Sequence, residues 1–141
     1  MNEPLVFERV YDATPAEIWN ALTDPEQMRQ WYFDIPGFRA EPGFEFSFIG
    51  GDETTKFTHL CRVTEAVPNQ KLAYTWRYAG YPGDSLVSFE LFDLGGGQTK
   101  LRLTHSGLET ITPHHEGFKR ENFREGWTYF SEKALPQFLA K

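Results

Sequence analysis

The sequence predicts an α+β fold in which one curved antiparallel β-sheet packs against a long C-terminal α-helix. Three observations support this prediction. Residues 43–108 alternate apolar and polar side chains with a period of two, which is typical of antiparallel strands with one covered face. Residues 121–141 return to a helical period, and residues 14–31 contain two successive helix-start signals.

Six strands are expected in the sheet, the first at residues 4–12. Five further apolar runs follow between residues 43 and 108, separated by short turns such as 68–70 and 95–98. Five successive hairpin-linked strands plus the first indicate a strongly curved sheet. The side chains expected on its covered face are mostly large: Phe7, Tyr11, Phe44, Phe46, Phe48, Phe57, His59, Cys61, Val63, Leu72, Tyr74, Trp76, Tyr78, Val87, Phe89, Leu91, Leu101, Leu103 and His105.

Two short helices are expected between the first and second strands. Thr14 is a candidate N-cap, with Pro15 at the first helical position and Glu17 three residues after the cap, which is the spacing of a capping box. Asp24 and Pro25 repeat this start. Because Pro25 excludes one continuous helix through its position, the second start predicts a second helix.

The C-terminal helix is expected to present an almost wholly aromatic stripe to the sheet. Phe123, Trp127 and Phe130 follow one another at steps of three or four residues. Pro136 removes one backbone hydrogen bond and would cost about 3 kcal/mol in a straight helix. We therefore expect a bend or an end of the helix near Lys133.

Length and composition favour one domain spanning residues 1–141. The 13 Phe, 6 Tyr and 4 Trp are unusual for a chain of this size. Since each ring can bury about 150–250 Å², these side chains could dominate the interior.

The charge and cysteine content exclude several classes of partner and location. The formal net charge is −6 without a basic stripe, which argues against nucleic-acid binding and against docking on an anionic membrane. We expect no membrane insertion, because no apolar run approaches about 18 residues, and the N-terminus does not have the pattern of a signal peptide. The lone Cys61 excludes an internal disulfide, so a cytoplasmic location is expected.

Four stretches of the sequence resemble a known family in the same order. VYDATPAEIWNALTDPEQMRQWY at residues 10–32 is similar to the opening signature of the START-like (SRPBCC) helix-grip superfamily, and more narrowly of the activator of heat-shock protein 90 ATPase homologue (AHSA-type) family. VTEAVPNQKLAYTW at 63–76, GGGQTKLRLTHSGLE at 95–109 and GWTYF at 126–130 resemble that family's later motifs. The resemblance covers nearly the whole chain.

The resemblance implies a helix-grip fold, with a six- or seven-stranded antiparallel sheet wrapped around the long C-terminal helix and the two short helices closing one end. It also implies a hydrophobic cavity between the sheet and that helix. Members of the superfamily include lipid carriers, plant-hormone binders and aromatase/cyclases of polyketide synthesis.

No nucleophile motif, phosphate-binding loop or metal-ligand constellation is found in the sequence, so we expect no catalytic site, no metal and no cofactor. Cys61 lacks the electropositive setting of a reactive thiolate, which favours an inert buried thiol. His114 and His115 lack further ligands at a metal-binding spacing, which favours a loop. His59 and His105 project onto the aromatic face, either hydrogen-bonded within the core or orienting an apolar ligand.

Three consecutive aromatic residues end the second short helix. We expect Trp31 to pack that helix against the sheet. Tyr32 and Phe33 are expected beside the mouth of the cavity, and the loop at residues 109–119, before the final helix, is a second candidate lid. Our hypothesis is that these two segments gate the cavity.

The leading functional hypothesis is a protein that binds a small hydrophobic or aromatic molecule in an internal cavity, in a stress response or another role. The residues expected to line that cavity are Trp31, Tyr32, Phe33, Phe46, Phe48, Phe57, His59, Cys61, Tyr74, Trp76, Phe89, Leu103, His105, Phe123, Trp127 and Phe130.

Two alternatives stay open at this point. One is a polyketide cyclase/aromatase-like or hydrolase-like enzyme that uses His105, His59 or Tyr74 as general acid or base. The other is a chaperone partner resembling the heat-shock protein 90 activators, ranked low because we see no added partner-binding segment. A homodimer formed through a sheet edge is also left open.

Overall fold

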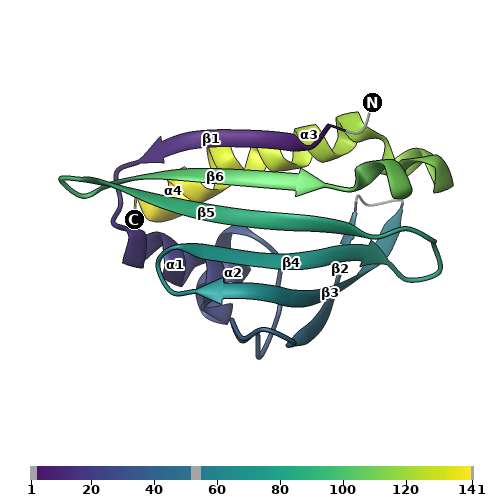
Figure 1. Cartoon of the computed structure of the whole chain (residues 1–141), viewed down its shortest axis with the longest axis horizontal. Coiled ribbons are helices and arrows are strands. Elements are labelled where there is room, and N and C mark those ends of the chain that lie inside the picture. Colours follow the sequence, from purple (N-terminus) through teal and green to yellow (C-terminus); the bar gives the residue numbers. More distant parts are fainter. Residues whose placement is uncertain (1–2, 52–54, 141) are drawn as a thin grey trace.

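Six antiparallel strands form one curved sheet, and the long C-terminal helix lies across its concave side (Figure 1). This computed structural model describes residues 3–51 and 55–140. The strand order is β1-β6-β5-β4-β3-β2. The strands are β1 (Leu5–Tyr11), β2 (Glu45–Gly51), β3 (Lys56–Val67), β4 (Lys71–Tyr78), β5 (Ser85–Gly95) and β6 (Gln98–Ser106). The predicted helix-grip fold is confirmed.

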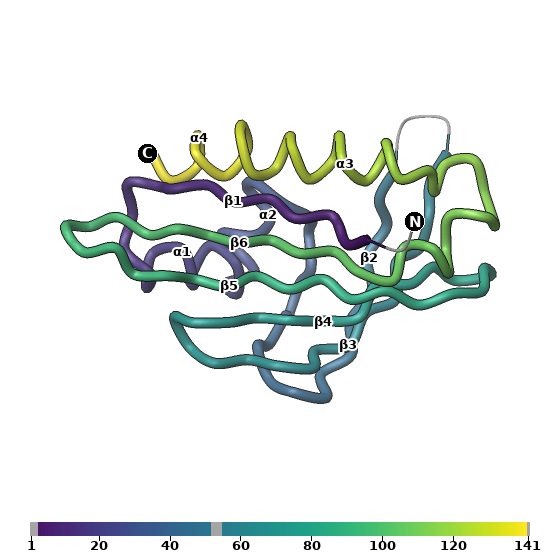
Figure 2. Tube along the Cα trace, turned by 45° about the horizontal axis from the view of Figure 1, so that its top comes forward, coloured from purple at the N-terminus to yellow at the C-terminus, as the bar shows by residue number. Residues whose placement is uncertain are grey.

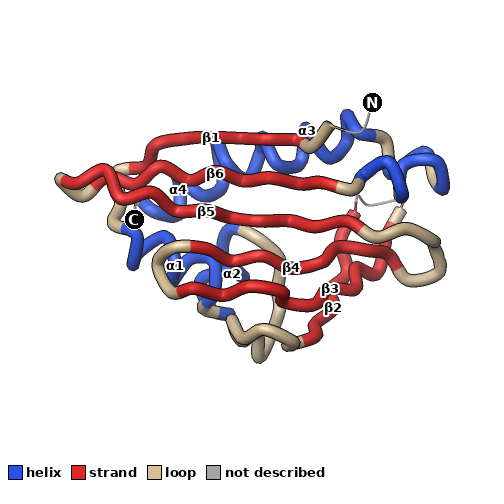
Figure 3. The backbone as a smooth tube through the Cα atoms, viewed as in Figure 1, coloured by secondary structure: helices blue, strands red, loops and turns tan. Residues whose placement is uncertain are grey.

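The two short helices lie at one end of the sheet, the helical turns that precede the C-terminal helix lie at the other end, and the C-terminal helix covers the concave face (Figures 2 and 3). Figure 2 shows the C-terminal helix running along the sheet, with the two short helices near the end where the chain finishes. The helical segments are α1 (Pro15–Thr23), α2 (Pro25–Trp31), the 3₁₀ helices η1 (Leu108–Thr110), η2 (Thr112–His114) and η3 (Glu116–Phe118), then α3 (Arg120–Tyr129), the π-helical η4 (Phe130–Ala134) and α4 (Leu135–Leu139). No helix among residues 3–51 and 55–140 has both the length and the apolar composition needed to cross a membrane.

Both short helices begin at the predicted caps. The Thr14 hydroxyl accepts from the Glu17 N–H at 3.2 Å, and the Glu17 carboxylate accepts from the Thr14 N–H at 2.8 Å, which completes the capping box. The Asp24 carboxylate caps α2 by accepting from the Glu26 N–H at 3.3 Å. The Trp31 indole N–H at the end of α2 donates to a backbone carbonyl of α1 at 2.8 Å, so the two helices are joined as one unit.

The alternation of side chains along the strands follows the sequence prediction. Every even-numbered residue from 72 to 78 and every odd-numbered residue from 87 to 91 is buried. On β1, Tyr11 is buried, whereas Val6 and Val10 are 51% and 48% exposed on the outer face. The large apolar side chains of the sheet are therefore directed mainly toward the C-terminal helix.

The C-terminal helix continues beyond Lys133, because a π-helical turn accommodates the proline. Within this turn the Leu135 N–H donates to the Phe130 carbonyl, five residues back. The next residue, Pro136, has no N–H, so the Ser131 carbonyl lacks a donor from its own helix. The buried Tyr11 hydroxyl of β1 donates to this carbonyl at 2.5 Å. The irregularity predicted near Lys133 is present as a π turn that β1 completes, and the helix does not end there.

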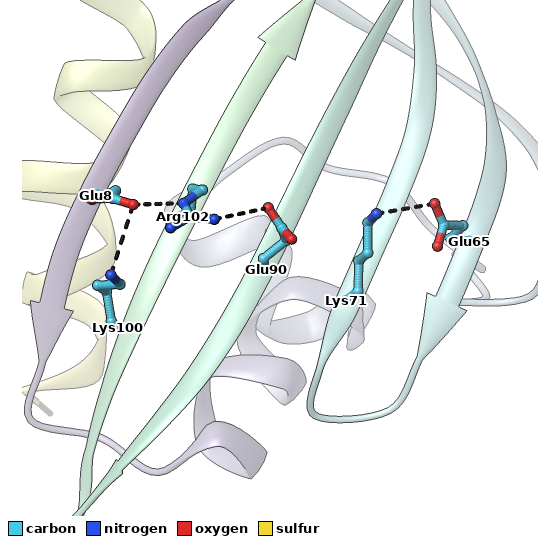
Figure 4. Close-up of polar contacts among 6 residues, drawn as sticks. All are labelled: Glu8, Glu65, Lys71, Glu90, Lys100 and Arg102. Carbon is cyan, nitrogen blue, oxygen red and sulfur yellow. Dashed lines mark hydrogen bonds and ion pairs between the residues drawn. The ribbon is translucent and has the colours of Figure 1, made fainter.

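The outer face of the sheet carries charged residues whose partners lie on neighbouring strands (Figure 4). Glu8 pairs with Arg102 at 2.6 Å, and Arg102 also approaches Glu90 at 3.9 Å. The hydrogen bond from Arg102 lowers the pKa of the Glu8 carboxyl, an effect that Lys100 reinforces. Such exposed pairs contribute little to stability, so the buried face carries most of the energy of the fold.

Candidate functional site

A cavity of about 810 Å³ lies between the curved sheet and the beginning of the C-terminal helix. Its walls come from β2, β3 and β4, from η3, and from α3 and the start of η4. The neighbouring ends of β2 and β3 can be followed beside the first turns of α3 in Figure 2. The curvature of the sheet thus brings together segments that are distant in the sequence.

The structure places the expected lining residues in three settings. Those on the wall of the cavity are Phe33, Phe57, His59, Trp76, Phe123, Trp127 and Phe130. Those packed in the core away from it are Phe48, Tyr74, Phe89, Leu103 and His105. The remaining four residues lie beside other voids. Trp31 and Tyr32 border a space of about 250 Å³ beside α4. Phe46 and Cys61 border a groove that also contains Arg62 and Arg77.

Tyr32 and Phe33 have different environments although they are adjacent. The Tyr32 hydroxyl lies 2.6 Å from the Tyr74 hydroxyl, and its ring stacks on Trp31. Phe33 stacks on Phe48 with ring centroids 4.3 Å apart and borders the cavity. Tyr32 therefore links α2 to the sheet, and Phe33 is the residue of the pair that faces the empty space.

His105 has both ring nitrogens engaged in the core. The Trp127 indole N–H donates to Nδ1 at 3.0 Å, so the proton of the neutral ring sits on Nε2. Nε2 donates to the Ser85 hydroxyl at 2.9 Å, and that hydroxyl donates to the Trp76 carbonyl at 2.6 Å. Burial lowers the pKa of His105 to about 3, which keeps the ring neutral. His105 thus holds the final helix to β4 and β5, and it has no unused nitrogen for acid–base chemistry.

His59 is also neutral, but it lies at the cavity wall. Its Nδ1 is 3.1 Å from the Phe57 carbonyl, and because a carbonyl has no proton to give, Nδ1 must be the donor. The ring stacks on Phe48 at 4.4 Å. Burial lowers the pKa of His59 to about 4, although interactions with the backbones of Phe57 and Phe48 act in the opposite direction. At neutral pH the remaining nitrogen, Nε2, is an uncharged hydrogen-bond acceptor.

Tyr78 provides a second polar group on the same wall. The Trp76 indole N–H donates to the Tyr78 hydroxyl at 2.9 Å, so this oxygen is fixed as an acceptor. Burial raises the pKa of Tyr78, and the side chain remains a phenol at neutral pH. Its own proton can therefore be donated to a third group.

Cys61 does not have the properties of a nucleophile. The side chain is buried, and burial raises the pKa of its thiol. In the part of the chain that the structure describes, no three His, Cys, Asp or Glu side chains come close enough together to bind a metal ion. His115, for its part, lines the cavity, with its Nδ1 accepting from the Gly117 N–H at 2.8 Å.

Gly126 is a cavity residue that the sequence reading did not identify. It lies inside α3, where glycine costs about 0.5–1 kcal/mol relative to alanine. A Cβ added there would meet no heavy atom within 4 Å beyond the backbone of its own helix. Neither backbone conformation nor tight packing requires glycine at this exposed position, which borders the cavity. An isolated Gly within the helical pattern was the available signal.

Solved structures share this fold over most of the chain. The protein MLL2253 from Mesorhizobium loti is 27% identical with a TM-score of 0.77, and the match covers 98% of this chain and 97% of that one. CV1439 from Chromobacterium violaceum is 24% identical with a TM-score of 0.80, covering 100% and 99%. DynU16, from the dynemicin biosynthetic locus, is 21% identical with a TM-score of 0.80, covering 100% of this chain and 48% of that one.

Sequence comparison gives a consistent assignment. The mouse activator of 90 kDa heat shock protein ATPase homolog 1 is 22% identical over 134 residues, which are 94% of this chain and 36% of the mouse protein. The chain therefore spans about a third of the length of that relative. The sequence profile of the family described as "Activator of Hsp90 ATPase homolog 1-like protein" matches residues 12–140. Because this match takes in all the helices and strands β2 to β6, the chain belongs to that family.

Proposed function

We propose that this protein binds a small apolar or aromatic molecule in the 810 Å³ cavity. The observation that carries the proposal is the cavity itself, which has a size typical of small-molecule sites and a wall rich in aromatic rings. His59 and Tyr78 are buried polar side chains on this wall, which is also lined by the polar residues Thr55, His115, Glu116, Lys119, Glu121 and Asn122.

Gly126 offers a position at which this proposal can be tested. Gly126 is an exposed residue that borders the cavity, and alanine there would stabilise the helix and would fit without a clash. The same position offers a matched pair of variants, because a small and a large side chain should have opposite consequences for a ligand.

The test measures ligand binding by thermal shift and native mass spectrometry, with naphthalene and oleate as probes. The native chain should bind one probe molecule and melt at a higher temperature. Gly126→Phe should weaken binding at least tenfold by filling the cavity, whereas Gly126→Ala should bind normally and be about 0.5–1 kcal/mol more stable. Equal binding by Gly126→Phe and the native chain would contradict the proposal.

The two alternative functions have less support. Acid–base catalysis would have to proceed without His105, whose nitrogens are both engaged, and without the Tyr74 hydroxyl, which pairs with Tyr32. A chaperone-partner role is supported by the family description and the mouse relative alone. Co-purification with the 90 kDa chaperone would test that role directly. An unrelated protein of similar negative charge would serve as the control.

A further inference from the structure

We infer that the ligand of this cavity is an uncharged planar aromatic molecule with a hydroxyl group, which is bound by His59 and Tyr78 together. This inference rests on the proposed function and specifies the chemistry of its ligand. It follows from two unused hydrogen-bonding capacities that lie next to each other on the cavity wall.

The first unused hydrogen-bonding group is the Nε2 lone pair of His59, which can accept a hydrogen bond. The side chain is 95% buried, since only 5% of its surface is exposed, and it lines the cavity. Its Nδ1 proton is used by the Phe57 carbonyl, which leaves a lone pair on Nε2. Among residues 3–51 and 55–140, no group donates a hydrogen bond to Nε2, and besides Phe57 the backbone of Phe48 also acts on the ring. In that same part of the chain, no fully buried polar side-chain atom lacks a partner, so an unpartnered Nε2 is not fully buried.

The second unused hydrogen-bonding group is the phenolic O–H of Tyr78, which can donate a hydrogen bond. Its oxygen accepts from Trp76, but the phenolic proton has no acceptor among the described residues. The ring is held firmly, with Phe118 stacked on it at a centroid distance of 4.2 Å. The direction of the hydroxyl is therefore set by the core before any ligand arrives, which reduces the entropy lost on binding.

The two side chains are neighbours on the sheet. His59 and Tyr78 are paired residues on adjacent strands β3 and β4, and their rings lie 4.7 Å apart. A ligand hydroxyl can donate its proton to Nε2 of His59 and accept the proton of Tyr78. An ether oxygen can only accept, and it would leave the His59 lone pair unsatisfied.

The charges and rings on the wall define the rest of the ligand. The charged residues there are Glu116, Lys119 and Glu121, all exposed at the rim, and two of the three are negative. A ligand carboxylate would lose its hydration without gaining a buried cation, which is unfavourable. The apolar wall includes Phe33 and Trp127, whose faces and edges suit a planar ring.

The test compares four probes of similar shape by isothermal titration calorimetry: 2-naphthol, 2-methoxynaphthalene, naphthalene and 2-naphthoate. The native chain should bind 2-naphthol about tenfold more tightly than 2-methoxynaphthalene, as expected when one or two hydrogen bonds are lost, and 2-naphthoate most weakly. Equal affinity for the alcohol and its methyl ether would overturn the inference.

Variants assign the preference to the two residues. His59→Leu should bind naphthalene within about twofold of the native chain but should lose the preference for 2-naphthol. Tyr78→Phe should reduce the same preference, and it provides the test if His59→Leu does not fold by circular dichroism. His114→Gln, at an exposed position outside the cavity, should behave as the native chain. A preference that survives in a folded His59→Leu or Tyr78→Phe protein would refute the assignment.

The outcomes separate the inference from the proposed function. Binding of naphthalene and 2-naphthol with equal affinity supports a cavity site and contradicts only the role of the hydroxyl group. Absence of binding by all four probes at their solubility limits contradicts the cavity proposal and the inference together.

Discussion

Individual residues show how polar groups are accommodated in an interior made mainly of rings. His105 is completely buried, yet each of its nitrogens has a partner, and the chain of bonds ends at the Trp76 carbonyl. Such a network specifies one arrangement of helix and sheet, because any shift would leave a buried polar atom unpaired. His59 differs from His105 because it lines the cavity.

Ser85→Ala tests this network. The variant leaves the Nε2–H of His105 and the Trp76 carbonyl without their partner, so the free energy of unfolding should fall by about 1–3 kcal/mol. Urea denaturation would measure the change. Ser88→Ala, on the same strand with its side chain directed to the other face, is the control and should change stability by less than about 0.5 kcal/mol. Equal effects of the two substitutions would argue against the network.

The two buried histidines also predict a pH dependence of stability. In the unfolded chain their pKa lies near 6.5, whereas in the folded chain it is lowered to about 4 for His59 and about 3 for His105. Below pH 6.5 the unfolded state therefore binds more protons, and stability must decrease as the pH falls. Between pH 6.5 and 5 the free energy of unfolding should drop by roughly 1–2 kcal/mol per histidine.

Urea denaturation at half-unit pH steps would measure this dependence. Working above pH 5 keeps most carboxyl groups ionised, so that the histidines dominate the change. His59→Leu should remove about half of the decrease. Constant stability across the interval would show that the imidazoles are not held neutral in the folded state.

At the scale of elements, the C-terminal helix and β1 depend on each other through the π turn. Pro136 removes the donor that would reach the Ser131 carbonyl, and Tyr11 replaces it from another element 120 residues away. A buried carbonyl without a donor would be unfavourable, so the π turn is stabilised by its contact with β1.

A double-mutant cycle tests this dependence. Tyr11→Phe should lower the free energy of unfolding by about 1–3 kcal/mol, because a buried carbonyl loses its donor. The same substitution should cost at least about 0.5–1 kcal/mol less in a Pro136→Ala background, where the restored N–H can bond to Ser131. Tyr129→Phe, at a side chain that is 56% exposed, serves as the control. Additive effects of Tyr11→Phe and Pro136→Ala would contradict the proposed compensation.

At the scale of the whole molecule, most of the architecture could be predicted from the sequence because it depends on local patterns. The period-two stretches predicted the strands and their buried faces, and the paired cap and proline signals predicted where α1 and α2 begin. These patterns reflect backbone geometry and burial, which act over a few residues.

The candidate site was less predictable because it depends on distant contacts. Periodicity identified aromatic residues on the concave face, but it could not distinguish rings that fill the core from rings that border a void. Tyr32 meets Tyr74 across 42 positions, and this contact directs it away from the cavity that Phe33 faces. Gly126 became informative only when its surroundings were known.

The four tryptophans offer the most direct measurement of ligand binding in the cavity. Trp76 and Trp127 line it, whereas Trp19 and Trp31 lie elsewhere. An NMR titration of the four indole N–H signals with naphthalene should give saturable shifts at Trp76 and Trp127 and much smaller ones at Trp19 and Trp31. Unchanged signals at Trp76 and Trp127, or shifts confined to Trp19 and Trp31, would contradict binding in this cavity.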